Sequence, residues 1–204
     1  FEDHFSVQEY YWKRIYKKHG FDIDIPSDLG VDYNFLLDAP SKKLIETFAS
    51  TERKKVLIFN QKTRSGQSDN QDYKSYLVRV ANIFSDCHFL YTNEEDIDDK
   101  LILDNNLTYT PTIFGEHESD IIHNAYLSLY CDVIVGRANG PYMYAAMHND
   151  NVSRDGKVII GQHNGNDRKD DLEIYFNRSI YKARNILAKT TKETFDALEN
   201  VLWE

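Results

Sequence analysis

The sequence predicts an α/β protein: a Rossmann-like three-layer sandwich with an open, mainly parallel sheet. Continuous apolar runs of β-rich composition, such as Val56–Phe59 and Asp132–Val135, are typical of strands that are covered on both faces. Segments with apolar residues at helical spacing separate these runs, so strands and helices alternate along the chain. Because parallel strands need right-handed crossover connections, helices are expected on both faces of the sheet.

The first fifty residues are predicted to form a helix and an extended connector. A capping box at Ser6–Glu9 begins the helix, and a His-Gly pair ends it. Residues 21–40, which contain prolines and glycine, form the connector, and apolar residues within 44–48 predict a short helix after it. We expect residues 1–50 to be the tail of a preceding domain and residues 51–204 to form the Rossmann-like domain.

The order of elements in the second part follows from the same patterns. Strands are predicted at 56–59, 87–91, 107–114, 132–135 and 158–160. Helices are predicted from the apolar stripe within 73–84, at 120–130 and just after Pro141. A long helix over 172–187 and a second one after the capping box Thr190–Glu193 are expected to close the chain.

Composition restricts the possible partners. The chain has 204 residues, 41% of them hydrophobic, and its 33 acidic against 24 basic residues give a formal net charge of -9. Such a surface repels polyphosphate backbones, so nucleic acid is not expected as a partner. There is neither an apolar run long enough to span a membrane nor a signal-like start, so we expect a cytoplasmic protein. Cys87 and Cys131 each precede an apolar run and are expected in the core.

The segment Gly136–Tyr142 is the strongest candidate for a ligand site. In an open parallel sheet ligands bind beyond the carboxyl ends of the strands, and this segment follows a predicted strand. Gly136 and Gly140 would let the main chain approach a phosphate at the start of the next helix, and a solvent-facing Arg137 would add a planar fork of donors. The alternative is that the glycines shape a tight turn and Arg137 forms a surface ion pair.

Other candidates follow the remaining strands. The small polar loop Ser65-Gly66-Gln67 precedes a helix but matches no phosphate-binding motif, and a solvated loop explains it equally well. Glu116 follows the third strand. His123 is placed to face the crevice, although a structural histidine is the simpler explanation. The full set of candidate ligand contacts is Ser65, Gly66, Gln67, Glu116, His123, Gly136, Arg137, Asn139 and Gly140.

The succession Tyr126-Leu127-Ser128, Cys131 to Gly136 and Asn139 to Tyr142 resembles the C-terminal half of bacterial GT-B glycosyltransferases, including the lipopolysaccharide heptosyltransferase-like group. The resemblance spans roughly residues 55–165. Asn139 stands where that group commonly has serine, and Tyr142 and Tyr144 lie where heptosyltransferases have histidine.

The resemblance implies polysaccharide biosynthesis. A nucleotide-diphosphate sugar would be the donor and a glycan or lipid-linked molecule the acceptor, while Arg137 and helix N-termini would stabilise the departing diphosphate. The N-terminal segment would be the tail of an acceptor domain that is absent from this chain, and the catalytic base would come from that domain. A catalytic residue is therefore not assigned.

Two further function classes stay open. One is a non-catalytic nucleotide or sugar-phosphate binding module. The other is a small hydrolase or phosphotransferase, for which the sequence offers neither a Gly-x-Ser-x-Gly elbow nor a Walker loop.

Metal dependence is not expected. Asp22-Ile23-Asp24 and Asp96-Ile97-Asp98 spell the Asp-x-Asp pattern of GT-A glycosyltransferases, but so short a pattern recurs by chance in an acidic chain. A hard cation needs oxygen ligands in fixed geometry, which a loose acidic loop does not supply. We therefore expect no metal ion and no cofactor other than the nucleotide-sugar donor.

Overall fold

The computed structural model describes residues 37–63, 68–93, 106–114, 121–138, 140–146, 148–163 and 182–204. These residues contain a six-stranded sheet of order β3-β2-β1-β4-β5-β6 in which every neighbouring pair is parallel. Its strands are β1 (Lys54–Phe59), β2 (Cys87–Tyr91), β3 (Leu107–Tyr109), β4 (Val133–Arg137), β5 (Val158–Gln162) and β6 (Arg184–Ala188). The predicted fold class, a Rossmann-like α/β sandwich, is confirmed.

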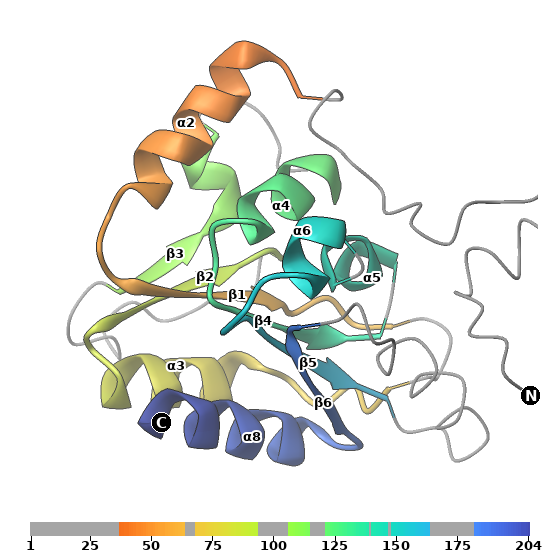
Figure 1. The fold of residues 1–204 in the computed structure, drawn as a ribbon. Coiled ribbons are helices and arrows are strands. Elements are labelled where there is room, and N and C mark those ends of the chain that lie inside the picture. The colour runs from red at the N-terminus through yellow and green to blue at the C-terminus, as the bar shows by residue number, and fades with distance from the viewer. Residues whose placement is uncertain are drawn as a thin grey trace, which may run out of the picture.

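Helices cover both faces of this sheet (Figure 1). One face carries α2 (Ala39–Ala49), α4 (Ile121–Ser128), α5 (Gly140–Ala146) and α6 (Asn149–Val152), and the other carries α3 (Lys74–Ile83) and α8 (Thr191–Trp203). The N-cap predicted at the start of α8 is present, since the Thr190 side chain accepts a hydrogen bond from the Glu193 N–H, while the Glu193 carboxylate accepts the N–H of Lys189, one residue before the cap. None of the described helices is both long and apolar enough to cross a membrane.

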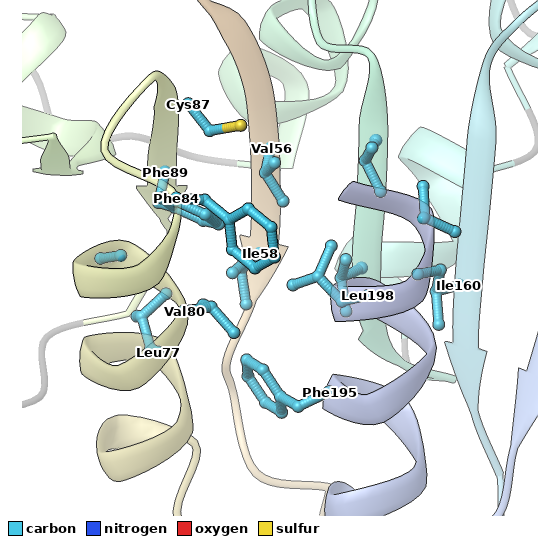
Figure 2. Packing of buried hydrophobic residues seen from close by; sticks show 14 of the residues in the cluster. Val56, Ile58, Leu77, Val80, Phe84, Cys87, Phe89, Ile160, Phe195 and Leu198 are labelled. Carbon is cyan, nitrogen blue, oxygen red and sulfur yellow. The ribbon is translucent and has the colours of Figure 1, made fainter. Parts of the chain in front are cut away.

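Two hydrophobic clusters lie on opposite faces of the sheet because side chains alternate along each strand. In β1, Val56 and Ile58 pack toward α3 and α8, whereas Leu57 and Phe59 belong to the cluster beneath α2, α4 and α5. Figure 2 shows the first of these clusters, in which Phe195 and Leu198 of α8 meet the strand residues. All of these side chains are at most 1% exposed. Burial of apolar area on both faces therefore holds the sheet between its two layers of helices.

The last part of the chain differs from the sequence prediction. Residues 184–188 form β6, an added parallel strand beside β5, and do not continue a helix. The predicted helix over 172–187 is therefore wrong at its end, and its earlier part lies outside the described residues. Ala183 and Leu187 are four residues apart, which fits a helical stripe, but a short edge strand with half-exposed side chains produces the same spacing.

The predicted third and fourth strands also have different bounds. The third strand ends at Tyr109, and a 3-10 helix, η2 (Thr110–Ile113), follows, in keeping with a proline that cannot donate to a sheet. The fourth strand runs on through Gly136 and Arg137, two residues further than the apolar run suggested. Cys87 and Cys131 are buried free thiols, as expected for core residues. The N-terminal helix and most of the connector lie outside the described residues.

Candidate functional site

The candidate site lies where the chain reverses its direction across the sheet. Successive strands proceed from β1 outward to β3, and the chain then returns to place β4 on the other side of β1. In open parallel sheets, ligands bind at this topological switch point, beyond the carboxyl ends of the strands. The ends of β4 and β5 meet the segment after β1 here, at Arg137, Gln162 and Asn60.

Arg137 is buried at this point, with none of its surface exposed. Its Nε donates to the carbonyl oxygen of Asp69 at 2.9 Å, and its Nη1 donates to the carbonyls of Asn60 at 3.0 Å and Gln61 at 3.3 Å. Its Nη2 donates to the carbonyl of Gln71. The expectation that Arg137 faces solvent is therefore wrong. The residue holds the segment after β1 against the segment that leads into α3.

The orientation of Arg137 follows from its place in a strand. It is the last residue of β4, not a loop residue, and it lies on the same face as Val133 and Val135, which pack toward α3 and α8. Its guanidinium carbon lies 3.8 Å from the centre of the Tyr73 ring, which adds a cation–π contact. The fork of donors predicted for a phosphate is thus directed at the protein's own carbonyl groups.

A buried polar network continues from Tyr73 to the end of β5. The Tyr73 hydroxyl donates to Gln162 Oε1 at 2.6 Å, and Gln162 Nε2 donates to the Asp69 carbonyl at 2.9 Å. The Ser68 hydroxyl donates to the Gln162 carbonyl at 2.8 Å. Burial raises the pKa of the Tyr73 phenol, although the charge of Arg137 opposes this. The phenol therefore stays protonated and donates a structural hydrogen bond to Gln162. On the α3 and α8 side of the switch point, these polar groups thus bond to one another.

On the opposite face of the sheet, the ends of β4 and β5 carry Gly136 and Gly161, and the aromatic ring of Tyr142 packs on these two glycines. A Cβ atom on Gly136 would lie 2.7 Å from Tyr142 Cδ2 and 2.8 Å from Phe59 Cβ, and one on Gly161 would lie 2.9 Å from the Tyr142 hydroxyl. These two glycines are required because the Tyr142 ring of α5 lies directly on the strands. The expectation that Gly136 lets the main chain approach a ligand is wrong, because the ring occupies that space.

Gly140 has different surroundings. It is the first residue of α5, is exposed, and has no described atom within 4 Å of the position that a Cβ would take. Its φ angle also lies outside the left-handed region that favours glycine. Neither packing nor backbone conformation therefore requires a glycine here. The main chain at the start of α5 is open beside the switch point, which is the geometry that close approach by a ligand needs.

The other predicted site residues do not join this group. His123 lies in α4, half-buried, with its ring centre 4.7 Å from that of Phe114. Ser65, Gly66, Gln67, Glu116 and Asn139 lie outside the described residues, and so do Asp22, Asp24, Asp96 and Asp98. Within the described ranges, no group of three histidine, cysteine or acidic side chains is placed to hold a metal ion.

Tyr73 and Gln162 were not recognised from the sequence as parts of one network with Arg137. Tyr73 lies within the apolar stripe that predicts a helix over 73–84, and Gln162 lies two residues after the predicted strand at 158–160. The available signal was strand alternation: extending the fourth and fifth strands by two residues places Arg137 and Gln162 on the same face as the valines and isoleucines that precede them.

Comparisons of the chain with protein-family models, with curated proteins and with solved structures gave no match. The candidate site has two sides. On the α3 and α8 side, the buried polar groups form hydrogen bonds with one another. On the α5 side, the main chain at Gly140 is open.

Proposed function

We propose that this chain is the donor-binding half of a metal-independent GT-B glycosyltransferase, which transfers a sugar from a nucleotide-diphosphate sugar to a glycan or lipid-linked acceptor. The observation that carries the proposal is the open backbone at Gly140, immediately after the β1/β4 switch point. The motif residues that resemble that enzyme group lead directly into this position.

In this proposal the chain binds the diphosphate through its main chain. The first N–H groups of a helix have no partner within the helix, and they attract negative charge; because Pro141 has no N–H, the donors at the start of α5 are those of Gly140, Tyr142 and Met143. Gly140 adds no side chain that would keep a phosphate away from them. Arg137 acts indirectly, because it holds the two ends of the connection from β1 to α3 through their carbonyl groups. The acceptor domain would supply the base that removes the proton from the acceptor hydroxyl.

Calorimetry on the full chain tests the diphosphate site. UDP, GDP and ADP are titrated beside the matching nucleosides, and at least one diphosphate is expected to bind more tightly than its nucleoside. Equal affinities of each pair would refute a phosphate site. Titration after EDTA treatment, and again with excess magnesium or manganese, is expected to give unchanged affinity, and a strong metal requirement would contradict the GT-B assignment.

A pair of variants at one position isolates the role of charge. Gly140→Asp places a carboxylate where the diphosphate is proposed to lie, and Gly140→Asn has nearly the same shape without the charge. Aspartate is favourable in the first turn of a helix, so the fold is expected to remain as stable as the wild type. Gly140→Asp should weaken diphosphate binding by about tenfold or more relative to Gly140→Asn. If the two variants bind alike, no phosphate lies beside Gly140.

A further inference from the structure

A second concave region lies at the other end of the sheet, where the strands begin. It is a pocket of about 560 Å³ formed by the connection from α2 to β1, the turn between α4 and β4, and the turn before β5. Figure 1 shows the connection from α2 into the start of β1. We call it the amino-end pocket, and its charged lining residues are Glu52, Arg53, Lys54, Lys55, Asp132 and Arg154.

Four cations against two carboxylates make this lining basic, although the chain as a whole carries a net charge of -9. One carboxylate is already engaged. Asp132 accepts the main-chain N–H of Lys55 at 2.8 Å and pairs with the guanidinium of Arg154 at 3.3 Å. The positive charge that remains in the pocket comes from Arg53 and Lys55, because the Lys54 ammonium donates to the carbonyl of Val201 in α8, on the opposite face of the sheet.

Lys55 contributes a buried charge to this pocket. Its side chain is 4% exposed, and its Nζ donates to the carbonyl oxygens of Thr51 and Arg53. No carboxylate lies within ion-pair distance of its ammonium group among the described residues. A buried cation that is held only by neutral carbonyls lacks the counter-charge that usually offsets its desolvation. An anion in the pocket would supply that counter-charge.

Arg53 contributes an accessible charge. It is exposed, and within the part of the chain that the structure describes its guanidinium has neither a hydrogen bond nor an ion pair. The combined field of Arg53 and Lys55 reaches the neighbouring strand. The pKa of His88 is lowered to about 4, mainly by burial and in addition by the charges of Arg53 and Lys55.

We propose that the amino-end pocket binds the phosphate group of a small metabolite, with Arg53 as its direct cationic contact and the buried charge of Lys55 behind it. The volume is that of a small-molecule site, and the polar lining suits a hydrated, charged ligand rather than an apolar one. Arginine offers the planar fork that phosphate oxygens accept, and lysine offers a point charge beneath it. This site is separate from the donor site, which lies at the carboxyl end of the same sheet.

The test uses inorganic pyrophosphate as the probe and the full chain in calorimetry, with sodium chloride of equal ionic strength as the blank. Gly140→Asp removes the proposed diphosphate site at the other end of the sheet. In that variant one saturable pyrophosphate site is expected to remain. Adding Arg53→Gln should weaken this site about tenfold, the loss of one charge-assisted contact.

Arg79→Gln is the matched control, because Arg79 is also an exposed arginine but pairs with Glu199 of α8, away from the pocket. It should leave pyrophosphate affinity unchanged, and Arg53→Gln alone should leave UDP affinity unchanged. The proposal is overturned if Gly140→Asp abolishes all pyrophosphate binding, if chloride reproduces the heat, or if Arg53→Gln binds as tightly as Arg79→Gln. A failure of UDP binding would concern only the donor site.

Discussion

Arg137 and Arg53 lie at opposite ends of the same sheet and differ in what surrounds them. Arg137 ends β4 with no exposed surface, and four main-chain carbonyls accept its hydrogen bonds. Arg53 immediately precedes β1 and is exposed, and its guanidinium has no hydrogen bond or ion pair to any described residue. From the sequence alone, Arg137 was the candidate ligand contact and Arg53 received no role.

This difference shows that position relative to a strand does not decide whether an arginine can bind a ligand. The number of neighbouring carbonyl oxygens decides it, because guanidinium donors that already have protein acceptors must give them up before they can bind a phosphate. At the carboxyl end, two segments present their carbonyls to Arg137. At the amino end the chain directs its carbonyls at Lys55 instead, which leaves Arg53 available.

The largest expected effect comes from removing the buried guanidinium. Arg137→Met leaves several buried carbonyls without their donor, and we expect it to lower the free energy of unfolding by about 3–5 kcal/mol. Arg53→Met, at an exposed position, should change it by less than about 0.5 kcal/mol. Urea denaturation of both variants measures the difference. An Arg137→Met variant that is as stable as the wild type yet has lost nucleotide binding would restore Arg137 as a ligand contact.

A smaller effect separates the two glycines on the α5 side. Gly136→Ala forces a methyl group against Tyr142 and Phe59 and should cost about 1–3 kcal/mol of unfolding free energy. Gly140→Ala adds its methyl group to open space and replaces a helical glycine, so stability should stay the same or rise by up to about 1 kcal/mol. Thermal and urea unfolding of the pair test this. Equal destabilisation would mean that Gly140 is also packed, and the open backbone would then no longer support a donor site.

The sequence predicted the sheet because its central strands are buried on both faces, which forces continuous apolar runs such as Val56–Phe59. It did not predict β6, whose side chains are mostly exposed or half-buried and therefore carry no continuous run. The α8 cap was predictable because capping is local: Thr190 and Glu193 are three residues apart.

The candidate site was less predictable because its contacts are distant along the chain. Arg137 meets carbonyls at Asn60 and Asp69, and nothing near Arg137 in the sequence indicates that these groups will converge. The amino-end pocket could not be predicted for the same reason, because its lining combines Arg53 with the distant residues Asp132 and Arg154. The place of Gly140 was predictable, because a helix was expected after the buried fourth strand and α5 begins at this glycine, while its role as a ligand contact stays a prediction.

The smallest expected effect is a change in the pKa of His88, which reports the electrostatic field of the cations in the amino-end pocket. The pKa of His88 is lowered to about 4, first by burial and then by the charges of Arg53 and Lys55. An unfolded chain protonates histidine near pH 6.5, so between about pH 6.5 and pH 4 the unfolded state binds more protons than the folded state. The contribution of His88 to the free energy of unfolding therefore falls as the pH is lowered through this window.

Arg53→Gln removes one cause of the low pKa and should raise the pKa of His88 by less than about one pH unit, because burial, the larger cause, remains. The part of the stability loss that His88 contributes between pH 6.5 and pH 4 should shrink by the same proportion, since its folded and unfolded proton affinities move closer together. NMR titration of the His88 ring protons and urea denaturation at pH 7 and pH 5 measure both quantities. Arg79→Gln should leave the titration of His88 unchanged, because Arg79 is not among the charges that act on this ring. If both variants shift it equally, the field at His88 reflects the overall charge of the protein and not the cations of the amino-end pocket.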